Sequence, residues 1–306
     1  MHAPIAYFAF NRPAHTKRTL AALAANPEAH CTDLHVFIDG PRHEADHPLV
    51  AEVMQIVRTI HGFRSIEVHA AEANRGLYYS ITNGVSEVVA AYRRVIVVED
   101  DVLVTPFFLA YMNDALDRYE SATAVGSIHA YSPPLDGLPD YFFLRGSNCW
   151  GWATWVDRWA LFRSDAKALL QELSDRRLID AFCARQGSQS LLLLERRAHG
   201  RNQSWATLWH ASLFLADRYT LYPGTSLAAN IGFDGTGTHA SDSTQFSTQI
   251  ATRYRGPPNV SVSEDVQIAA NWSAYLDTAA AGNRRWLTPS LLRIYAKLAL
   301  RLPFLL

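Results

Sequence analysis

Three consecutive carboxylates, Glu99, Asp100 and Asp101, follow an apolar run at residues 95–98. An uninterrupted β-branched run of this kind is typical of a strand buried on both faces of a parallel sheet, which places the acids at its carboxyl end. Ligands of open α/β sheets bind at that edge. Adjacent acids repel one another, and a divalent cation that bridges phosphate oxygens would relieve the repulsion. The alternative is a solvated turn in which the acids only keep a loop soluble.

The position of these acids depends on strands and helices that the hydrophobic pattern predicts over the first hundred residues. Pro13 is well placed in the first turn of one helix. Elements that alternate at roughly thirty-residue spacing favour right-handed βαβ units and a parallel sheet. The expected strands are residues 5–10, 34–38, 66–68 and 95–98, and the expected helices run through residues 13–23, 50–57 and 81–89.

Polar side chains follow several of these strands at the same sheet edge. Arg12 comes after the first strand, Asp39 after the second, and Arg75 lies in a neighbouring loop. The topology would gather Arg12, Asp39 and the three acids into one crevice. An arginine can neutralise phosphate there and an aspartate can accept a ring N–H from a base, which suits a nucleotide diphosphate. For Asp39 the alternative is a turn residue before Gly40, and the chain has no Gly-rich loop of the Rossmann or P-loop type.

The second half of the chain adds aromatic rings and a glycine-rich loop. Trp150 and Trp152 belong to a dense aromatic block, and ring faces flanked by polar groups suit a sugar. The alternative is that these rings pack in the core. The loop at residues 230–239 holds three glycines together with Asp234 and His239. A histidine on such a loop beside an acid is a candidate metal or phosphate ligand.

In this order the motifs resemble bacterial glycosyltransferases of the GT-A fold, near the family-two-like enzymes and similar in layout to the N-acetylglucosaminyltransferase I group. The resemblance spans roughly residues 4–240. It implies an α/β fold with a mostly parallel sheet, in which a Rossmann-like nucleotide-binding half is followed by an acceptor half. It also implies a nucleotide-sugar donor, usually a UDP-sugar, and a Mn²⁺ or Mg²⁺ ion at the acidic motif.

The resemblance assigns roles to individual residues. Those expected in the nucleotide-sugar site are Arg12 at the nucleotide, Asp39 at uracil, Glu99 at the donor sugar, Asp100 at the ribose or a metal-bound water, and Arg75, Trp150 and Trp152 in the lining. Asp101 is the expected metal ligand, with His239 as the second.

The resemblance further implies inversion at the anomeric carbon, with a carboxylate as general base. Related enzymes often carry an acid beside the Ser-Trp pair, which is Ser204–Trp205 here, but Gln203 and an alanine flank the pair in this chain. The general base is therefore left unassigned by the resemblance. Asp234 is the first substitute, because it lies on the glycine-rich loop, and Asp157 is the second.

Three segments are expected: a nucleotide-sugar-binding half at 1–135, an acceptor and catalytic half at 136–275, and a tail at 276–306. In the tail, leucines at helical spacing and a stripe of basic residues predict an amphipathic helix over 286–306. Such a helix would lie on the cytoplasmic face of an anionic membrane. The alternatives are docking on the catalytic domain or pairing in a homodimer.

Composition narrows the possible classes of protein and function. The 306 residues, 49% of them hydrophobic, allow a large core, while the formal charge of −1 gives no nucleic-acid signature. Three scattered cysteines and the absence of a signal-like N-terminus favour a cytoplasmic protein, peripheral if the tail binds membrane. We expect a transferase that acts on a glycan or lipid-linked acceptor in cell-envelope polysaccharide synthesis. The alternatives are a sugar nucleotidyltransferase and a non-catalytic carbohydrate-binding protein.

Overall fold

The computed structural model describes residues 2–235 and 246–282. Its centre is an eight-stranded sheet with the order β3-β2-β1-β4-β8-β6-β9-β7. All strands run in the same direction except β8 and β7, which are antiparallel to their neighbours. The predicted α/β class with a mostly parallel sheet is confirmed. The predicted tail helix at 286–306 lies outside the described residues.

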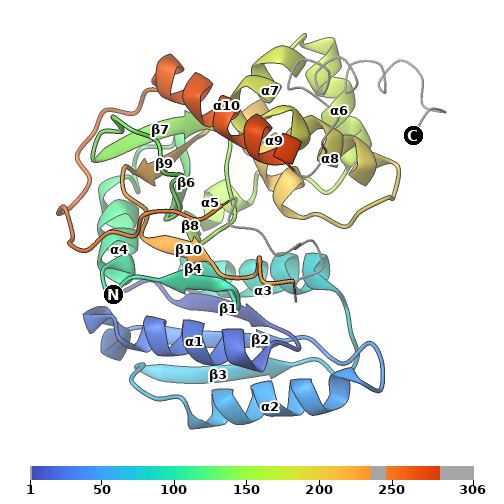
Figure 1. Cartoon of the computed structure of the whole chain (residues 1–306), viewed down its shortest axis with the longest axis vertical. Coiled ribbons are helices and arrows are strands. Elements are labelled where there is room, and N and C mark those ends of the chain that lie inside the picture. Colours follow the sequence, from blue (N-terminus) through green and yellow to red (C-terminus); the bar gives the residue numbers. More distant parts are fainter. Residues whose placement is uncertain (1, 236–245, 283–306) are drawn as a thin grey trace.

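The N-terminal half of the sheet consists of parallel strands linked by helices, as the hydrophobic pattern predicted (Figure 1). Helices α1 and α2 pack on one face of this half and α3 packs on the other. The carboxyl ends of the strands therefore meet at one edge. The elements are β1 (Ile5–Ala9), α1 (Pro13–Ala24), the 3₁₀ helix η1 (Pro27–Cys31), β2 (Asp33–Ile38), α2 (Asp46–Thr59), β3 (Ser65–Ala70), α3 (Leu77–Tyr92) and β4 (Arg94–Glu99).

The second half continues the same sheet, because β8 inserts between β4 and β6 and pairs antiparallel with both. A separate two-stranded sheet of β5 and β10 joins the chain after β4 to the segment before the glycine-rich loop. The strands are β5 (Val102–Val104), β6 (Val125–His129), β7 (Tyr141–Arg145), β8 (Trp152–Trp155), β9 (Tyr219–Pro223) and β10 (Ala228–Asn230).

The remaining helices cover the second half. Helix α9 is buried along almost its whole length, since it lies between the sheet and helices α6 and α8. Helix α10 contacts α7 and runs through the boundary expected between residues 275 and 276. The helices are α4 (Phe108–Arg118), α5 (Val156–Trp159), α6 (Ala166–Asp175), α7 (Ile179–Gln186), α8 (Ser188–Ala198), α9 (Ala206–Leu215) and α10 (Val266–Gly282).

No helix within residues 2–235 and 246–282 combines the length and the apolar character needed to cross a bilayer.

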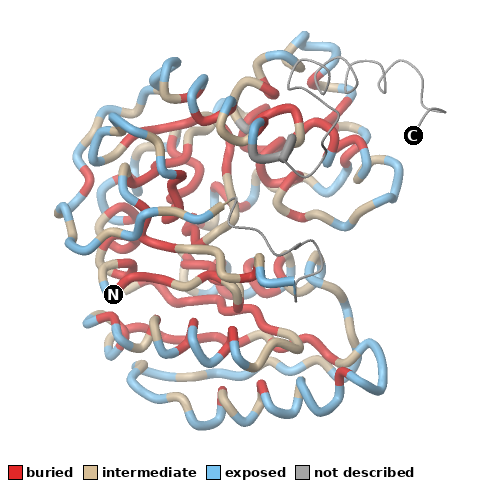
Figure 2. The backbone as a smooth tube through the Cα atoms, in the orientation of Figure 1, coloured by how far each residue is buried: buried red, intermediate tan, exposed pale blue. Residues whose placement is uncertain are grey.

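A cluster of tryptophans fills the core between the sheet and the helices of the second half. Trp152 has no exposed surface, and its ring lies 5.4 Å from that of Trp205 and 6.0 Å from that of Trp209, centroid to centroid. Figure 2 shows the inner strands of the sheet as buried, whereas the edge strand β3 is largely exposed. The core alternative therefore holds for Trp152, which cannot offer a ring face to a sugar.

This packing predicts that Trp152→Ala lowers the free energy of unfolding by about 3–5 kcal/mol, because the substitution leaves a large cavity in a fully buried site. Urea unfolding followed by circular dichroism would measure the change. Tyr79→Ala is the matched control, since Tyr79 is 54% exposed and a surface substitution should change stability by no more than about 0.5 kcal/mol. Equal effects of the two variants would contradict the assignment of Trp152 to the core.

Candidate functional site

The three acids lie where β4 ends and the chain turns into β5. Asp100 is buried, with 3% of its surface exposed, and its carbonyl accepts a hydrogen bond from Thr19 Oγ1 at 2.8 Å. The carbonyl of Asp101 accepts one from the backbone N–H of Ile231 at 2.8 Å. Helix α1 and the loop after β10 thus hold the acidic turn from two sides.

Arg12 is the cation nearest to these acids. It is the N-cap residue of α1, which Pro13 begins, so the strand-to-helix turn after β1 aims the guanidinium at the end of β4. Arg12 Nη2 pairs with Asp100 and also lies 3.1 Å from Asp101 Oδ2. The prediction that the sheet topology would bring Arg12 and the acidic motif together is confirmed.

The site has more negative charge than its single guanidinium balances. Within the described part of the chain, Arg12 is the only arginine or lysine in ion-pair distance of the three acids, and the carboxylate of Glu99 makes no hydrogen bond or ion pair. Burial raises the pKa of Asp100 to about 6, although Arg12 opposes the shift. Burial, followed by repulsion from Asp101 and Asp100, raises the pKa of Glu99 well above its usual range.

This donor set fits a divalent cation. Oxygen atoms of carboxylates are the ligands that Mg²⁺ and Ca²⁺ prefer, and Mn²⁺ shares that preference. The side chain of Asp101 is 18% exposed and that of Asp100 only 4%, so Asp101 is the more accessible ligand. A second cation beside Arg12 would let the acids stay ionised together, because opposite charge lowers a carboxyl pKa.

The backbone of the loop after β10 rests on the Arg12–Asp101 pair. A Cβ added at Gly232 would lie 2.5 Å from Asp101 Oδ2 and 3.1 Å from Arg12 Nη1. The shorter distance means that the Asp101 carboxylate would have to shift to admit a side chain at residue 232. The Gly232 N–H donates to Asn230 Oδ1 at 2.8 Å, which fixes the turn locally. The lack of a side chain at Gly232 therefore lets the backbone lie directly against the charged pair.

The same loop brings Asp234 to the site. Asp234 Oδ2 lies 3.2 Å from His15 Nε2, which is also 3.2 Å from the carbonyl oxygen of Ile231. Asp234 is partly open, with 46% of its side chain exposed, whereas His15 is buried. The second expected metal ligand, His239, lies outside the described residues.

His15 is a site residue that the sequence analysis missed. It lies on α1 in register with the two polar residues that touch the acidic turn, Arg12 and Thr19. Residues at positions i, i+3 and i+7 share one face of a helix. The sequence therefore indicates a polar face of this helix at residues 12, 15 and 19. It does not indicate that His15 contacts the loop after β10.

Asp39 has a different setting from the one expected. Its carboxylate accepts backbone N–H groups of Gly40, Arg75 and Gly76 at 3.0, 2.8 and 2.9 Å. These bonds tie the end of β2 to the N-terminus of α3, and the Arg75 side chain is exposed. No hydrogen bond or ion pair between described residues joins Asp39 to the acidic motif. Asp39 thus anchors a loop, an extension of its alternative role as a turn residue.

Trp150, unlike Trp152, stands at the side of the site. Its ring lies 4.7 Å from Tyr131, 5.7 Å from Phe233 and 5.2 Å from Phe246, in edge-to-face contacts. Phe233 lies between Gly232 and Asp234, so the partly buried Trp150 supports the loop that carries the expected base.

Asp157 does not belong to this group. Strand β8 is antiparallel to β4, and Trp155 pairs with Arg94 at the start of β4, while Glu99 ends that strand. Five residues of strand separate the two ends by about 16 Å. Asp157 pairs instead with its neighbour Arg158. The sequence alone could not show the antiparallel direction of β8, which puts Asp157 at the wrong end of the sheet.

No protein-family model and no curated protein matches the chain. Among solved structures, it is similar to the mannosyltransferase PcManGT from Pyrobaculum calidifontis, solved in complex with GDP-Man and Mn²⁺. The two sequences are 13% identical, the match covers 99% of this chain and 81% of the other, and the TM-score is 0.42. A likeness this distant does not define a family for this chain.

Proposed function

We propose that the chain is a metal-dependent, inverting glycosyltransferase of GT-A type that moves a sugar from a nucleotide-sugar, a UDP-sugar in the first instance, to a glycan or lipid-linked acceptor. The observation that carries this proposal is the buried acidic turn after β4, where one guanidinium pairs with two of three adjacent carboxylates and leaves Glu99 without a counterion among the described residues. The excess negative charge at the ligand-binding edge of a parallel sheet favours a divalent cation together with a diphosphate.

Each group has a distinct task in this proposal. Asp101 would hold the cation, and Arg12, which pairs with Asp100 and Asp101, would supply positive charge for the phosphates. The carboxylate of Glu99 has no hydrogen-bond or ion-pair partner among the described residues, so it can accept hydrogen bonds from hydroxyl groups of the donor sugar. When bound, Mn²⁺ or Mg²⁺ supplies the positive charge that stabilises the departing diphosphate.

Asp234 is the proposed general base. It lies on the loop that contacts Asp101 through Gly232, and its carboxylate is partly exposed to an incoming acceptor. His15 Nε2 lies 3.2 Å from that carboxylate and orients it. Asp234 would take the proton of the acceptor hydroxyl as that oxygen attacks the anomeric carbon, which requires hydrogen-bond reach between the two groups.

Calorimetric titration of the protein with UDP and Mn²⁺, followed by hydrolysis assays with a panel of UDP- and GDP-sugars, tests the proposal. Metal-dependent binding with sugar release is the expected result. Binding without turnover of any donor or acceptor would favour a carbohydrate-binding protein. Pyrophosphate release from a nucleoside triphosphate and a sugar phosphate would favour a nucleotidyltransferase.

Asp101→Asn should abolish metal-dependent nucleotide binding, because the amide keeps the size of the side chain but loses the charge that offsets the cation. Titration with UDP in the presence and absence of Mn²⁺ measures this. Asp117→Asn is the control, since Asp117 is an exposed aspartate paired with Arg94 at the opposite end of β4. Equal binding by Asp101→Asn and the parent would overturn the metal assignment.

Asp234→Asn should lower turnover by about 10²–10⁴-fold while leaving donor affinity nearly unchanged, because a general base acts on the acceptor and not on the bound donor. Asp157→Asn should leave turnover unchanged, because Asp157 follows β8 at the end of the sheet opposite the acidic turn. Initial rates at saturating donor check both. Normal turnover by Asp234→Asn would remove Asp234 from the mechanism.

Asp39→Ala separates the two roles of this residue. Loss of its bonds to the loop at residues 75–76 should destabilise the protein by about 1–3 kcal/mol for each buried donor left unpaired. If Asp39 also accepts a hydrogen bond from uracil, the variant should bind UDP more weakly by about 1.5–3 kcal/mol. Its affinity for ADP should not show this loss. Parallel titrations with UDP and ADP decide, and an equal loss for both would leave Asp39 only its anchoring role.

A further inference from the structure

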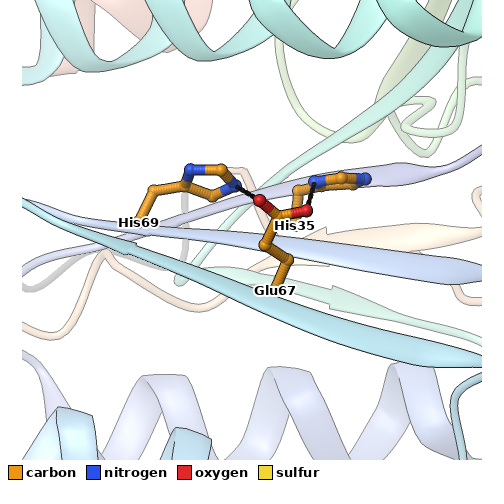
Figure 3. Close-up of side chains that lie close together, drawn as sticks. All are labelled: His35, Glu67 and His69. Carbon is orange, nitrogen blue, oxygen red and sulfur yellow. Dashed lines mark ion pairs between the residues drawn. The ribbon is translucent and has the colours of Figure 1, made fainter.

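A second group of titratable residues lies on β2 and β3, apart from the acidic turn. His35 on β2 stands opposite Glu67 on β3, and His69 follows two residues after Glu67 on the same face of the sheet. Figure 3 shows the carboxylate of Glu67 between the two imidazole rings. The alternation of side chains along a strand places all three on the face that α3 covers.

The spacing of the polar atoms suits a small cation. His35 Nδ1 lies 3.4 Å from one oxygen of Glu67, and His69 Nε2 lies 3.6 Å from the other. One ligand atom from each residue can be chosen so that all lie within 4.8 Å of one another. Ligands at about 2.0–2.1 Å from a tetrahedral Zn²⁺ stand about 3.3 Å apart, so only small side-chain rotations are needed.

The surroundings favour a metal over a cluster of protonated histidines. The imidazole rings of His35 and His69 stack with their centroids 5.8 Å apart, so two positive charges would repel. Nε2 of His35 and Nε2 of His69 are both buried and make no hydrogen bond within the described part of the chain.

A further carboxylate stands behind one of the rings. His69 Nδ1 lies 3.6 Å from an oxygen of Glu87 on α3, on the side away from Glu67. Metal-binding histidines usually present their second nitrogen to a carboxylate, which fixes the tautomer and makes the ring a better ligand. Glu67 is 62% exposed, which gives an ion access from solvent.

We propose that His35, Glu67 and His69 form a zinc site, with Glu87 orienting His69 and water completing the coordination. Two imidazoles and one carboxylate suit Zn²⁺ better than Mg²⁺, which prefers oxygen ligands. The ion would link β2 to the edge strand β3 and, through Glu87, to α3. The site is independent of the proposed transferase activity, because it shares no residue with the acidic turn.

Titration of the metal-stripped full-length protein with Zn²⁺ against a fluorescent chelator tests the site. One ion per chain should bind at this site. Glu87→Gln should weaken its binding by about 10–100-fold, and His69→Gln should weaken it more, because it removes a direct ligand. Glu44→Ala and His47→Gln form the matched control, since these residues make an exposed histidine–glutamate pair on and before α2.

Two further measurements separate this site from the acidic turn. Excess Mg²⁺ and the substitution Asp101→Asn should both leave the affinity for Zn²⁺ at this site unchanged. The visible spectrum of Co²⁺ bound in place of Zn²⁺ should change in His69→Gln while UDP and Mn²⁺ binding persist, which also shows that the variant is folded. Unchanged Zn²⁺ affinity in His69→Gln, or loss of the ion in Asp101→Asn, would overturn the proposal.

Discussion

The ion pair between Arg12 and Asp100 is the interaction on which the candidate site depends. It joins the start of α1 to the end of β4 in a place where Asp100 is almost fully buried. Removal of one partner of such a pair typically costs about 3–5 kcal/mol, because the remaining charge stays buried without compensation. The pair therefore fixes the turn of the chain that presents Asp101 and Glu99.

The same pair sets the electrostatics of the crevice. Arg12 is shared between two aspartates, and it leaves Glu99 without a counterion in the described structure. Stability would gain from neutralising these acids by protonation, by metal binding or by both. Adjacent acids with a single counterion stabilise the fold less than an apolar core of the same size would. Such local instability is common at sites where a protein binds a charged ligand.

Much of the first half could be predicted from the sequence, because its apolar runs are long and periodic and its connections follow the handedness of βαβ units. That regularity placed Arg12 next to the acidic turn. The fold of the second half was harder to predict. Two of the four residues of β8 are tryptophans, and such a composition does not distinguish a core strand from a sugar-binding loop. The reversed direction of β8 put Asp157 at the far end of the sheet.

Two other features depend on partners that no local pattern reveals. The role of Asp39 rests on backbone N–H groups of residues 75 and 76, and backbone donors leave no signature in a sequence. The His35–Glu67–His69 group depends on the register of β2 against β3. A shift of the pairing by one residue would turn His35 to the face opposite that of Glu67 and His69.

The contact of Gly232 with Asp101 and Arg12 also constrains how this site can diverge. Three positions far apart in the chain meet here, and a Cβ at position 232 would press against the Asp101 carboxylate. A homologous chain with a side chain at position 232 would have to move that carboxylate, either by a different residue at position 101 or by a shift of the side chain or the loop. The residue at position 232 is therefore coupled to the position of the Asp101 carboxylate and, through the ion pair, to Arg12.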